Sequence, residues 1–110
     1  MTPLPRALHK SGFWGLVAFL ALALPAAAAP AQQFPTASGP VTITPIYHAA
    51  AMIQAGNDRI YIDPASPARI DGLPPGDLIL ITDIHGDHMD KADVKTLSKA
   101  DTAIIAPAVV

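Results

Sequence analysis

Residues 78–88 have the sequence Leu-Ile-Leu-Ile-Thr-Asp-Ile-His-Gly-Asp-His, in which an apolar run is followed directly by acidic and histidine side chains. A continuous run of branched apolar residues is typical of a strand that is buried on both faces inside a sheet. Ligands and catalytic groups gather at the carboxyl ends of parallel strands. We therefore expect this stretch to form the centre of the fold and to carry the chemistry.

The residues after this stretch predict a helix and a second buried strand. Asp90 and Asp93 resemble a capping box, and both carboxylates suit the positive end of a helix dipole. The expected apolar stripe of the helix consists of Val94, Leu97 and Ala100, and its solvated face of Lys91, Lys95 and Lys99. The apolar residues 103–106 then return as a strand, so residues 78–106 are predicted to form a β-loop-α-β unit. Its strands should be parallel and its crossover right-handed.

The residues before the stretch predict three further strands. Residues 41–44 alternate apolar and polar side chains, as in a half-buried strand, and Pro45 favours an edge position or a bend. Residues 50–54 and 59–62 are predicted to pair as a hairpin, because the Ala-Gly-Asn-Asp segment between them tolerates positive φ. Residues 64–76, rich in proline and glycine, should form a connecting loop.

The first 31 residues are predicted to be a secretory signal peptide. Positive charge at Arg6 and Lys10 precedes an apolar run at residues 13–24 and a stretch rich in alanine, and this order of regions is that of a signal peptide. Cleavage is expected after Ala31. The alternative, an uncleaved membrane anchor, is disfavoured because the strictly apolar run is shorter than the roughly 20 residues that span a bilayer.

Residues 32–40 contain proline, serine and glycine without periodicity and predict a flexible lead-in, so order is expected to begin at Val41. The chain is therefore divided into a signal peptide (residues 1–31), a lead-in (residues 32–40) and one domain (residues 41–110).

The charge and composition of the exported chain exclude several classes of function. Removal of the signal peptide leaves five basic residues against nine aspartates, a net charge of about −4 with histidine neutral. This balance offers no basic patch for nucleic acid. The absence of cysteine excludes disulfides, a lipid anchor and a thiolate nucleophile. We expect a periplasmic or secreted protein, without a membrane anchor after cleavage, that acts on a small-molecule substrate; its oligomeric state stays open.

Four side chains within six residues are candidate metal ligands, namely Asp83, His85, Asp87 and His88. Imidazole nitrogen and carboxylate oxygen suit a borderline ion such as zinc. In extended backbone the first three would point the same way, and Gly86 permits the turn that brings in His88. For any one of these residues, a helix cap or an exposed loop histidine is the simpler interpretation. The whole string at the end of a buried strand favours a metal site.

Residues 82–88 resemble the Thr-His-x-His-x-Asp-His signature of the metallo-β-lactamase superfamily. The Ile-Asp-Pro turn at residues 62–64 is similar too, and the Tyr-His-Ala-Ala segment at residues 47–50 resembles the Gly-His-Ala/Ser segment of the branch that includes ascorbate-6-phosphate lactonase-like proteins. The resemblance covers roughly residues 41–107. It implies an α+β fold, the N-terminal half of an αββα sandwich, preceded here by the signal peptide.

The same resemblance implies a metal-dependent hydrolase in which one or two zinc ions, or another divalent metal, supply a metal-bound hydroxide. His85 would help bind the first ion, and Asp87 and His88 the second, with Asp87 also acting in catalysis by orienting the hydroxide. Asp83 stands where the family has its first histidine, so the first site is expected to be weakened, to take a harder metal or to be empty. The substrate would be a lactone, amide, ester or phosphoester.

Two neighbouring residues are less certain members of the site. Asp63 is expected to hold in place the loop that carries the candidate metal ligands. For His48, a hydrogen-bonded strand-end histidine and a role near the metal are equally open.

The family takes further ligands from later segments, and the sequence stops directly after an apolar strand whose edge is unprotected. We therefore expect an active enzyme to need more chain after Val110. Two alternatives stay open: a catalytically inactive truncated remnant and a small periplasmic metal-binding module.

Overall fold

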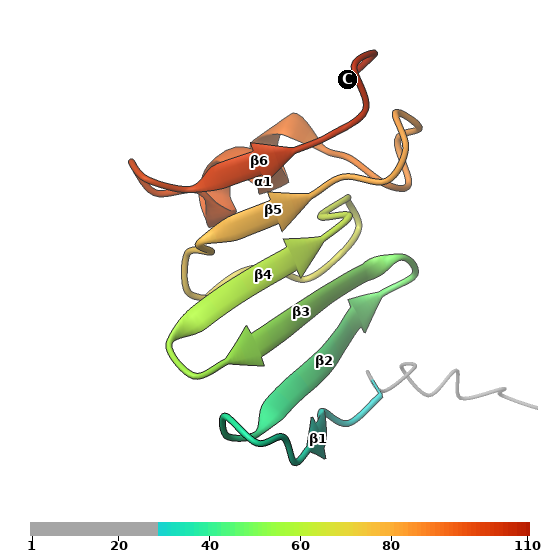
Figure 1. Ribbon diagram of the computed structural model, residues 1–110. Coiled ribbons are helices and arrows are strands. Elements are labelled where there is room, and N and C mark those ends of the chain that lie inside the picture. The colour runs from blue at the N-terminus through green and yellow to red at the C-terminus, as the bar shows by residue number, and fades with distance from the viewer. Residues whose placement is uncertain (1–28) are drawn as a thin grey trace, which may run out of the picture.

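The computed structural model of the protein describes residues 29–110. Within them six strands form one sheet in the order β1-β2-β3-β4-β5-β6, and one helix, α1, packs against it (Figure 1). The strands are β1 (Gln32–Phe34), β2 (Val41–Tyr47), β3 (Ala50–Ala55), β4 (Asp58–Ile62), β5 (Leu78–Leu80) and β6 (Ala103–Ile105), and the helix is α1 (Lys91–Leu97). Apart from residues 29–31, the predicted signal peptide lies outside this range. No helix in the described range is long and apolar enough to cross a membrane.

The sheet is mixed, since β1 to β4 pair antiparallel whereas β4, β5 and β6 pair parallel. The predicted hairpin is confirmed: β3 and β4 pair from Ala51 and Ile62 to Ala55 and Asp58, and Gly56 in the turn has a φ of 58°. A helix on one side of a mixed sheet is compatible with part of an α+β hydrolase fold.

The expectation that order begins at Val41 is wrong. Strand β1 pairs with residues 41–43 of β2 after a turn in which the Gly39 amide donates to the Thr36 carbonyl at 3.2 Å and Gly39 has a φ of 110°. All three side chains of β1 are exposed. This strand is therefore held by main-chain hydrogen bonds, which leave no side-chain periodicity in the sequence.

Pro45 lies inside β2, beyond the end of its pairing with β1, so at this residue the strand has a neighbour on one side only. Proline is tolerated in such an edge position because it has no amide hydrogen to donate. The register with β3 shifts between Pro45 and Tyr47. The predicted bend is therefore realised as an irregularity within the strand.

Helix α1 connects β5 to β6, and Figure 1 shows it behind these strands, so the crossover is right-handed as predicted. Asp90 is the N-cap and accepts hydrogen bonds from the amides of Ala92 at 2.8 Å and Asp93 at 3.1 Å. The helix packs one side against the sheet. The buried side chains of this core are Tyr61, Ile70, Ile79, Ile81 and Leu97.

The end of the helix departs from the prediction. It stops at Leu97, so Ala100 and Lys99 lie outside it. The ammonium of Lys99 contacts the carboxylates of Asp77 and Asp101 and does not belong to a solvated helix face. This pairing links the connection before β5 to the connection before β6.

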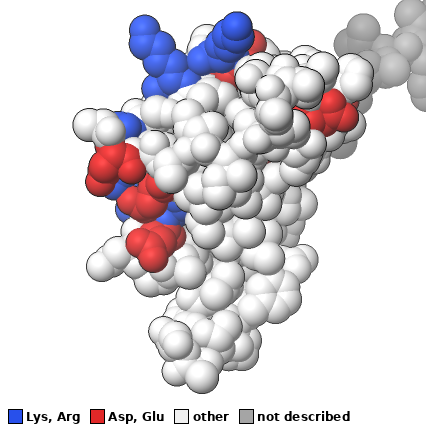
Figure 2. Space-filling view, turned by 45° about the horizontal axis from the view of Figure 1, so that its top comes forward, with Lys and Arg blue, Asp and Glu red and all other residues white. Residues whose placement is uncertain are grey.

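The prediction that β5 and β6 are buried on both faces is also wrong for the described residues. Ile79 is fully buried, but Leu78 and Leu80 on the opposite face are half-buried, and Ile104 and Ile105 of β6 are 51% and 60% exposed. The reason is that residues 29–110 supply one helix, which covers one face of the sheet. Figure 2 shows a broad surface almost free of acidic and basic side chains, as expected for an uncovered sheet face.

Candidate metal centre

The predicted site residues lie at the carboxyl ends of β2, β4 and β5, which point in the same direction (Figure 1). His48 follows β2, Asp63 follows β4, and residues 82–88 follow β5. Within residues 29–110, His48 and Asp63 are the two non-glycine residues with positive φ, at 51° and 45°. Side chains with a Cβ seldom adopt this conformation, and such strain concentrates at functional sites.

Asp63 binds the loop after β5 to the end of β4. Its carboxylate is buried and accepts hydrogen bonds from the Thr82 amide at 2.7 Å, the Thr82 hydroxyl at 2.6 Å and Nδ1 of His88 at 2.9 Å. Burial raises the pKa of Asp63, but the hydrogen bonds from Thr82 and His88 outweigh it and bring the pKa below its ordinary value. The expected role of Asp63 in holding the loop is confirmed.

The hydrogen bond from Asp63 determines how His88 presents its ring. An ionised carboxylate can only accept, so Nδ1 of His88 carries the hydrogen and Nε2 of the neutral ring has a free lone pair. This Nε2 lies 3.7 Å from Oδ2 of Asp87. The bond to Asp63 raises the pKa of His88, and the charges of Asp87, Asp63 and Asp83 add to that effect. An imidazole oriented by a carboxylate in this way is the usual state of a metal-ligating histidine.

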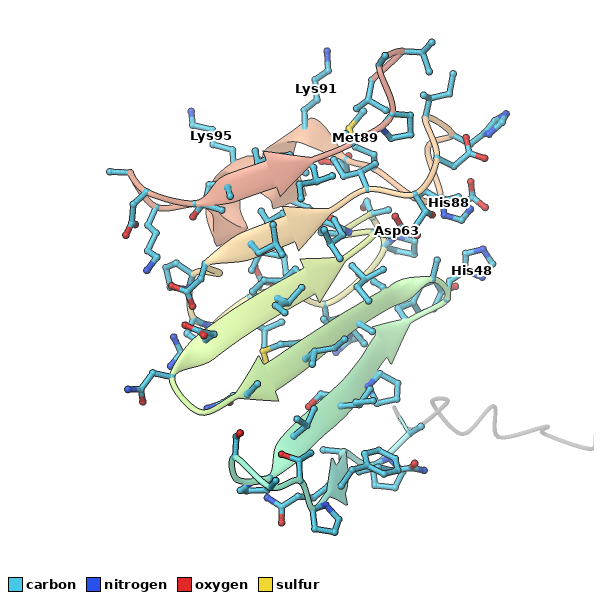
Figure 3. All side chains as sticks on the ribbon, in the orientation of Figure 1. His48, Asp63, His88, Met89, Lys91 and Lys95 are labelled. Carbon is cyan, nitrogen blue, oxygen red and sulfur yellow. The ribbon has the colours of Figure 1, made fainter. Side chains whose placement is uncertain are left out.

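The carboxylate of Asp87 lies between two histidine rings, since Oδ2 is near Nε2 of His88 and also near Nε2 of His48. Nε2 of His48 lies 3.2 Å from Oδ2 of Asp87, and the rings of His48 and His88 have centroids 6.4 Å apart. The hydrogen bond with His48 is the main cause of a lowered pKa of Asp87. Figure 3 shows His48, Asp63 and His88 grouped at this end of the sheet.

Asp83 and His85 form a separate pair within the loop. Oδ1 of Asp83 lies 2.7 Å from Nδ1 of His85 and 3.3 Å from its backbone amide, and the hydrogen bond from the His85 ring lowers the pKa of Asp83. In the part of the chain that the structure describes, no three histidine or aspartate side chains are arranged to hold a metal ion together. The four predicted ligands thus lie as two pairs, and their assignment as ligands stays a prediction.

The donors of Asp87 and His88 nevertheless fit a shared ion. Two ligands of a tetrahedral zinc ion lie about 3.3 Å apart, from bond lengths near 2.05 Å, and Oδ2 of Asp87 and Nε2 of His88 are separated by 3.7 Å. Carboxylate oxygen and imidazole nitrogen are both zinc ligands. The separation of the pair is therefore compatible with two donors of one metal site.

A groove beside α1 differs chemically from the candidate metal centre. It is an open groove of about 440 Å³, lined almost entirely by apolar atoms. Its lining residues are Ile81, Met89, Lys91, Val94, Lys95, Ser98, Ile104 and Val110. It contains neither histidine nor aspartate, so the candidate chemistry lies at the strand ends and not in this groove.

Sequence reasoning found Asp63, Asp87 and His88, but it left the role of His48 open. The contact between His48 and Asp87 spans 39 positions, so no local spacing could reveal it. The signal available was the His-Ala-Ala segment ahead of the hairpin, which marks a histidine at a strand end without naming its partner.

Comparison with known proteins supports a metallo-hydrolase fold. No family model matches the chain. The crystal structure of a "Putative metal-dependent hydrolase" from Parabacteroides distasonis ATCC 8503 is 40% identical, with a TM-score of 0.69. The match covers 73% of this chain and 37% of that chain, so the present chain spans little more than a third of its neighbour. Within that part the two proteins share the same fold.

Proposed function

We propose that this protein is a metal-dependent hydrolase in which Asp87 and His88 hold a divalent ion, zinc in the first place. The observation that carries the proposal is the chain of contacts from buried Asp63 through Nδ1 of His88 to a free Nε2 that faces Asp87. The "Putative metal-dependent hydrolase" from Parabacteroides distasonis, similar over most of this chain, supports the same reaction class.

A bound divalent ion would lower the pKa of water towards neutrality and polarise a carbonyl or phosphoryl oxygen of the substrate. The residues of the chain have separate tasks around it. Asp63 fixes the ring and the tautomer of His88, Thr82 holds Asp63 in place through two hydrogen bonds, and Asp87 would orient the attacking water. These tasks keep the donors in position before the substrate arrives.

We propose His85 as a ligand of a further ion, at the first of the two sites that the resemblance implies. Its Nδ1 is bonded to Asp83, which leaves Nε2 free in the same way as in His88. In this conformation Asp83 is bonded to His85, whereas the sequence named Asp83 as a candidate ligand and left open whether it replaces the histidine of the family. Whether the protein takes one or two ions therefore depends on whether the Asp83–His85 pair turns towards Asp87.

We propose a small lactone, amide, ester or phosphoester as the substrate. The charge of about −4 after signal cleavage offers little attraction to nucleic acid. The predicted signal peptide supports action in the periplasm or outside the cell.

The test uses the full-length protein and measures bound zinc together with hydrolysis of a panel of these four bond types. Activity should disappear with a chelator and return with zinc. Asp87→Ala should lower activity at least about 100-fold, as expected on removal of a group that both binds and orients. The matched control is Lys95→Ala on the exposed side of α1, which should change nothing.

Activity that survives both the chelator and Asp87→Ala would overturn the proposal. Stoichiometric zinc without turnover of any substrate would instead favour the metal-binding module.

A further inference from the structure

His48 occupies a strained position that the fold maintains. Its φ of 51° lies in the left-handed region, and the register of β2 against β3 shifts just before it, between Pro45 and Tyr47. Such irregularities at a strand end re-aim a side chain. Here the ring is directed to the end of the sheet that carries His88 and Asp63 (Figure 3).

The two strained residues of the described chain act on two consecutive residues of the motif. Asp63, with a φ of 45°, contacts Nδ1 of His88, and His48 contacts Oδ2 of Asp87. The contacts span 25 and 39 positions, so β2 and β4 each hold one of the two donors that β5 presents. Both donors of the proposed ion thus have a partner from another strand.

The contact of His48 has the geometry of a hydrogen bond. Nε2 lies 3.2 Å from Oδ2 of Asp87, and the carboxylate can only accept, so the ring donates. Within residues 29–110, His48 is not part of a three-residue group that could hold an ion. The side chains are 59% and 55% exposed, so water competes for the bond, and the backbone position of His48 at the end of β2 places the ring within reach of Asp87.

We propose that His48 is a positioning residue: its Nε2–H donates to Oδ2 of Asp87 and holds that carboxylate beside Nε2 of His88. The proposal rests on the proposed metal-dependent function, because it assigns a task around the same ion. It makes the turn between β2 and β3 a part of the metal centre.

The test measures zinc affinity of the full-length protein by competition with a chromophoric chelator. His48→Asn keeps a residue that tolerates positive φ, but its shorter side chain does not reach Asp87. Loss of such a partner should weaken zinc binding about 10- to 100-fold. His48→Gln, whose longer amide can donate to the same oxygen, should restore affinity towards that of the unmodified protein. The control Tyr47→Phe should bind zinc unchanged.

A second measurement is made without metal. In the ¹⁵N NMR spectrum of the metal-free protein, the fraction of the neutral His48 ring that is protonated at Nε2 should be higher than in Asp87→Ala, because the carboxylate adds to the preference for Nε2–H that a free histidine already has. Equal fractions in the two proteins would contradict the bond.

Three results would overturn the proposal. These are unchanged affinity in His48→Asn, failure of His48→Gln to improve on His48→Asn, and a loss in His48→Asn as complete as in Asp87→Ala, which would make His48 a ligand. If the unmodified protein binds no zinc, the proposed function fails, and the difference in Nε2 protonation of His48 between the unmodified protein and Asp87→Ala still decides whether the bond to Asp87 exists.

Discussion

The end of the sheet holds two carboxylate–histidine pairs of similar bond length and very different setting. Asp63 and His88 are 2.9 Å apart and join the end of β4 to the loop after β5 across 25 positions, with the carboxylate only 3% exposed. Asp83 and His85 are 2.7 Å apart, two positions apart in one loop, and 44% and 74% exposed. A hydrogen bond in a loop competes with water, whereas a buried bond between strands fixes both partners. The difference indicates that the ring of His88 is held in one orientation by Asp63, whereas the ring of His85 can change its orientation.

The largest expected effect comes from breaking the buried pair. Asp63→Ala removes a buried acceptor of three hydrogen bonds, two of them from Thr82. Hydrogen bonds to charged groups contribute about 1.5–3 kcal/mol each without being additive, and alanine at a φ of 45° adds roughly 1 kcal/mol. We expect the free energy of unfolding to fall by about 3 kcal/mol or more, as measured by chemical denaturation.

The sequence predicted those parts of the fold that depend on local pattern. The cap at Asp90 and the Gly56 turn were found because each requires particular residue types at fixed spacing. Strand β1 was missed because its pairing with β2 involves exposed side chains and main-chain bonds. The burial of β5 and β6 was overestimated because an apolar run predicts two covering layers and residues 29–110 contain one.

The candidate site was predictable to a similar degree. The candidate ligands Asp87 and His88 stand in one short motif, so their residue types and spacing were enough to predict them. The partner contacts of Asp63 and His48 depend on how β2 and β4 lie beside β5, and the sequence contains no periodic signal for that arrangement. The sequence therefore points to the two candidate ligands, whose assignment stays a prediction, more directly than to the contacts that Asp63 and His48 make with them.

A subtler change at Asp63 tests the tautomer of His88 and keeps a side chain of the same size at position 63. Asp63→Asn keeps the volume and suits positive φ, but its amide nitrogen donates where the carboxylate accepted. Nδ1 of His88 should then become the acceptor and Nε2 should carry the hydrogen, which blocks ligation at Nε2. We expect zinc affinity to fall at least about tenfold while most of the fold is kept. Far-ultraviolet circular dichroism monitors the fold, and an unchanged affinity would contradict the assigned tautomer.

Asp93 provides a third setting, a half-buried carboxylate in which one oxygen is buried without a partner. Its Oδ2 is buried and has no hydrogen-bond partner, and burial raises the pKa of Asp93, with the charges of Asp90 and Asp71 adding to the effect. An unpaired buried group costs about 1–3 kcal/mol, whereas a charge at this helix terminus contributes about 0.3–1 kcal/mol. Asp93→Ala should therefore stabilise the protein by about 1 kcal/mol at pH 7.

The pH dependence of the stabilisation by Asp93→Ala distinguishes removal of a buried charge from the higher helix propensity of alanine. Because the folded pKa of Asp93 is raised, ionisation destabilises the fold as the pH rises through that pKa, and the penalty is absent below the unfolded value of about 3.9. The advantage of Asp93→Ala should thus shrink as the pH falls from 7 towards 4. Denaturation curves of both proteins across this range measure it, and a constant or growing advantage would contradict the assignment.

The smallest effect is expected at the exposed pair. Asp83→Ala removes a bond that lies within one loop and is open to water on both sides, so the melting temperature should change by no more than about 2 °C. The same exposure leaves His85 unanchored, so in the presence of zinc Asp83→Ala should alter the number of ions bound per chain and not the affinity of the Asp87–His88 position. Metal titrations of Asp83→Ala and Asp63→Asn, compared with each other, distinguish the contribution of the Asp83–His85 pair from that of the Asp63–His88 pair. A destabilisation by Asp83→Ala as large as that by Asp63→Ala would show that the loop after β5 is held at Asp83 as firmly as at Asp63.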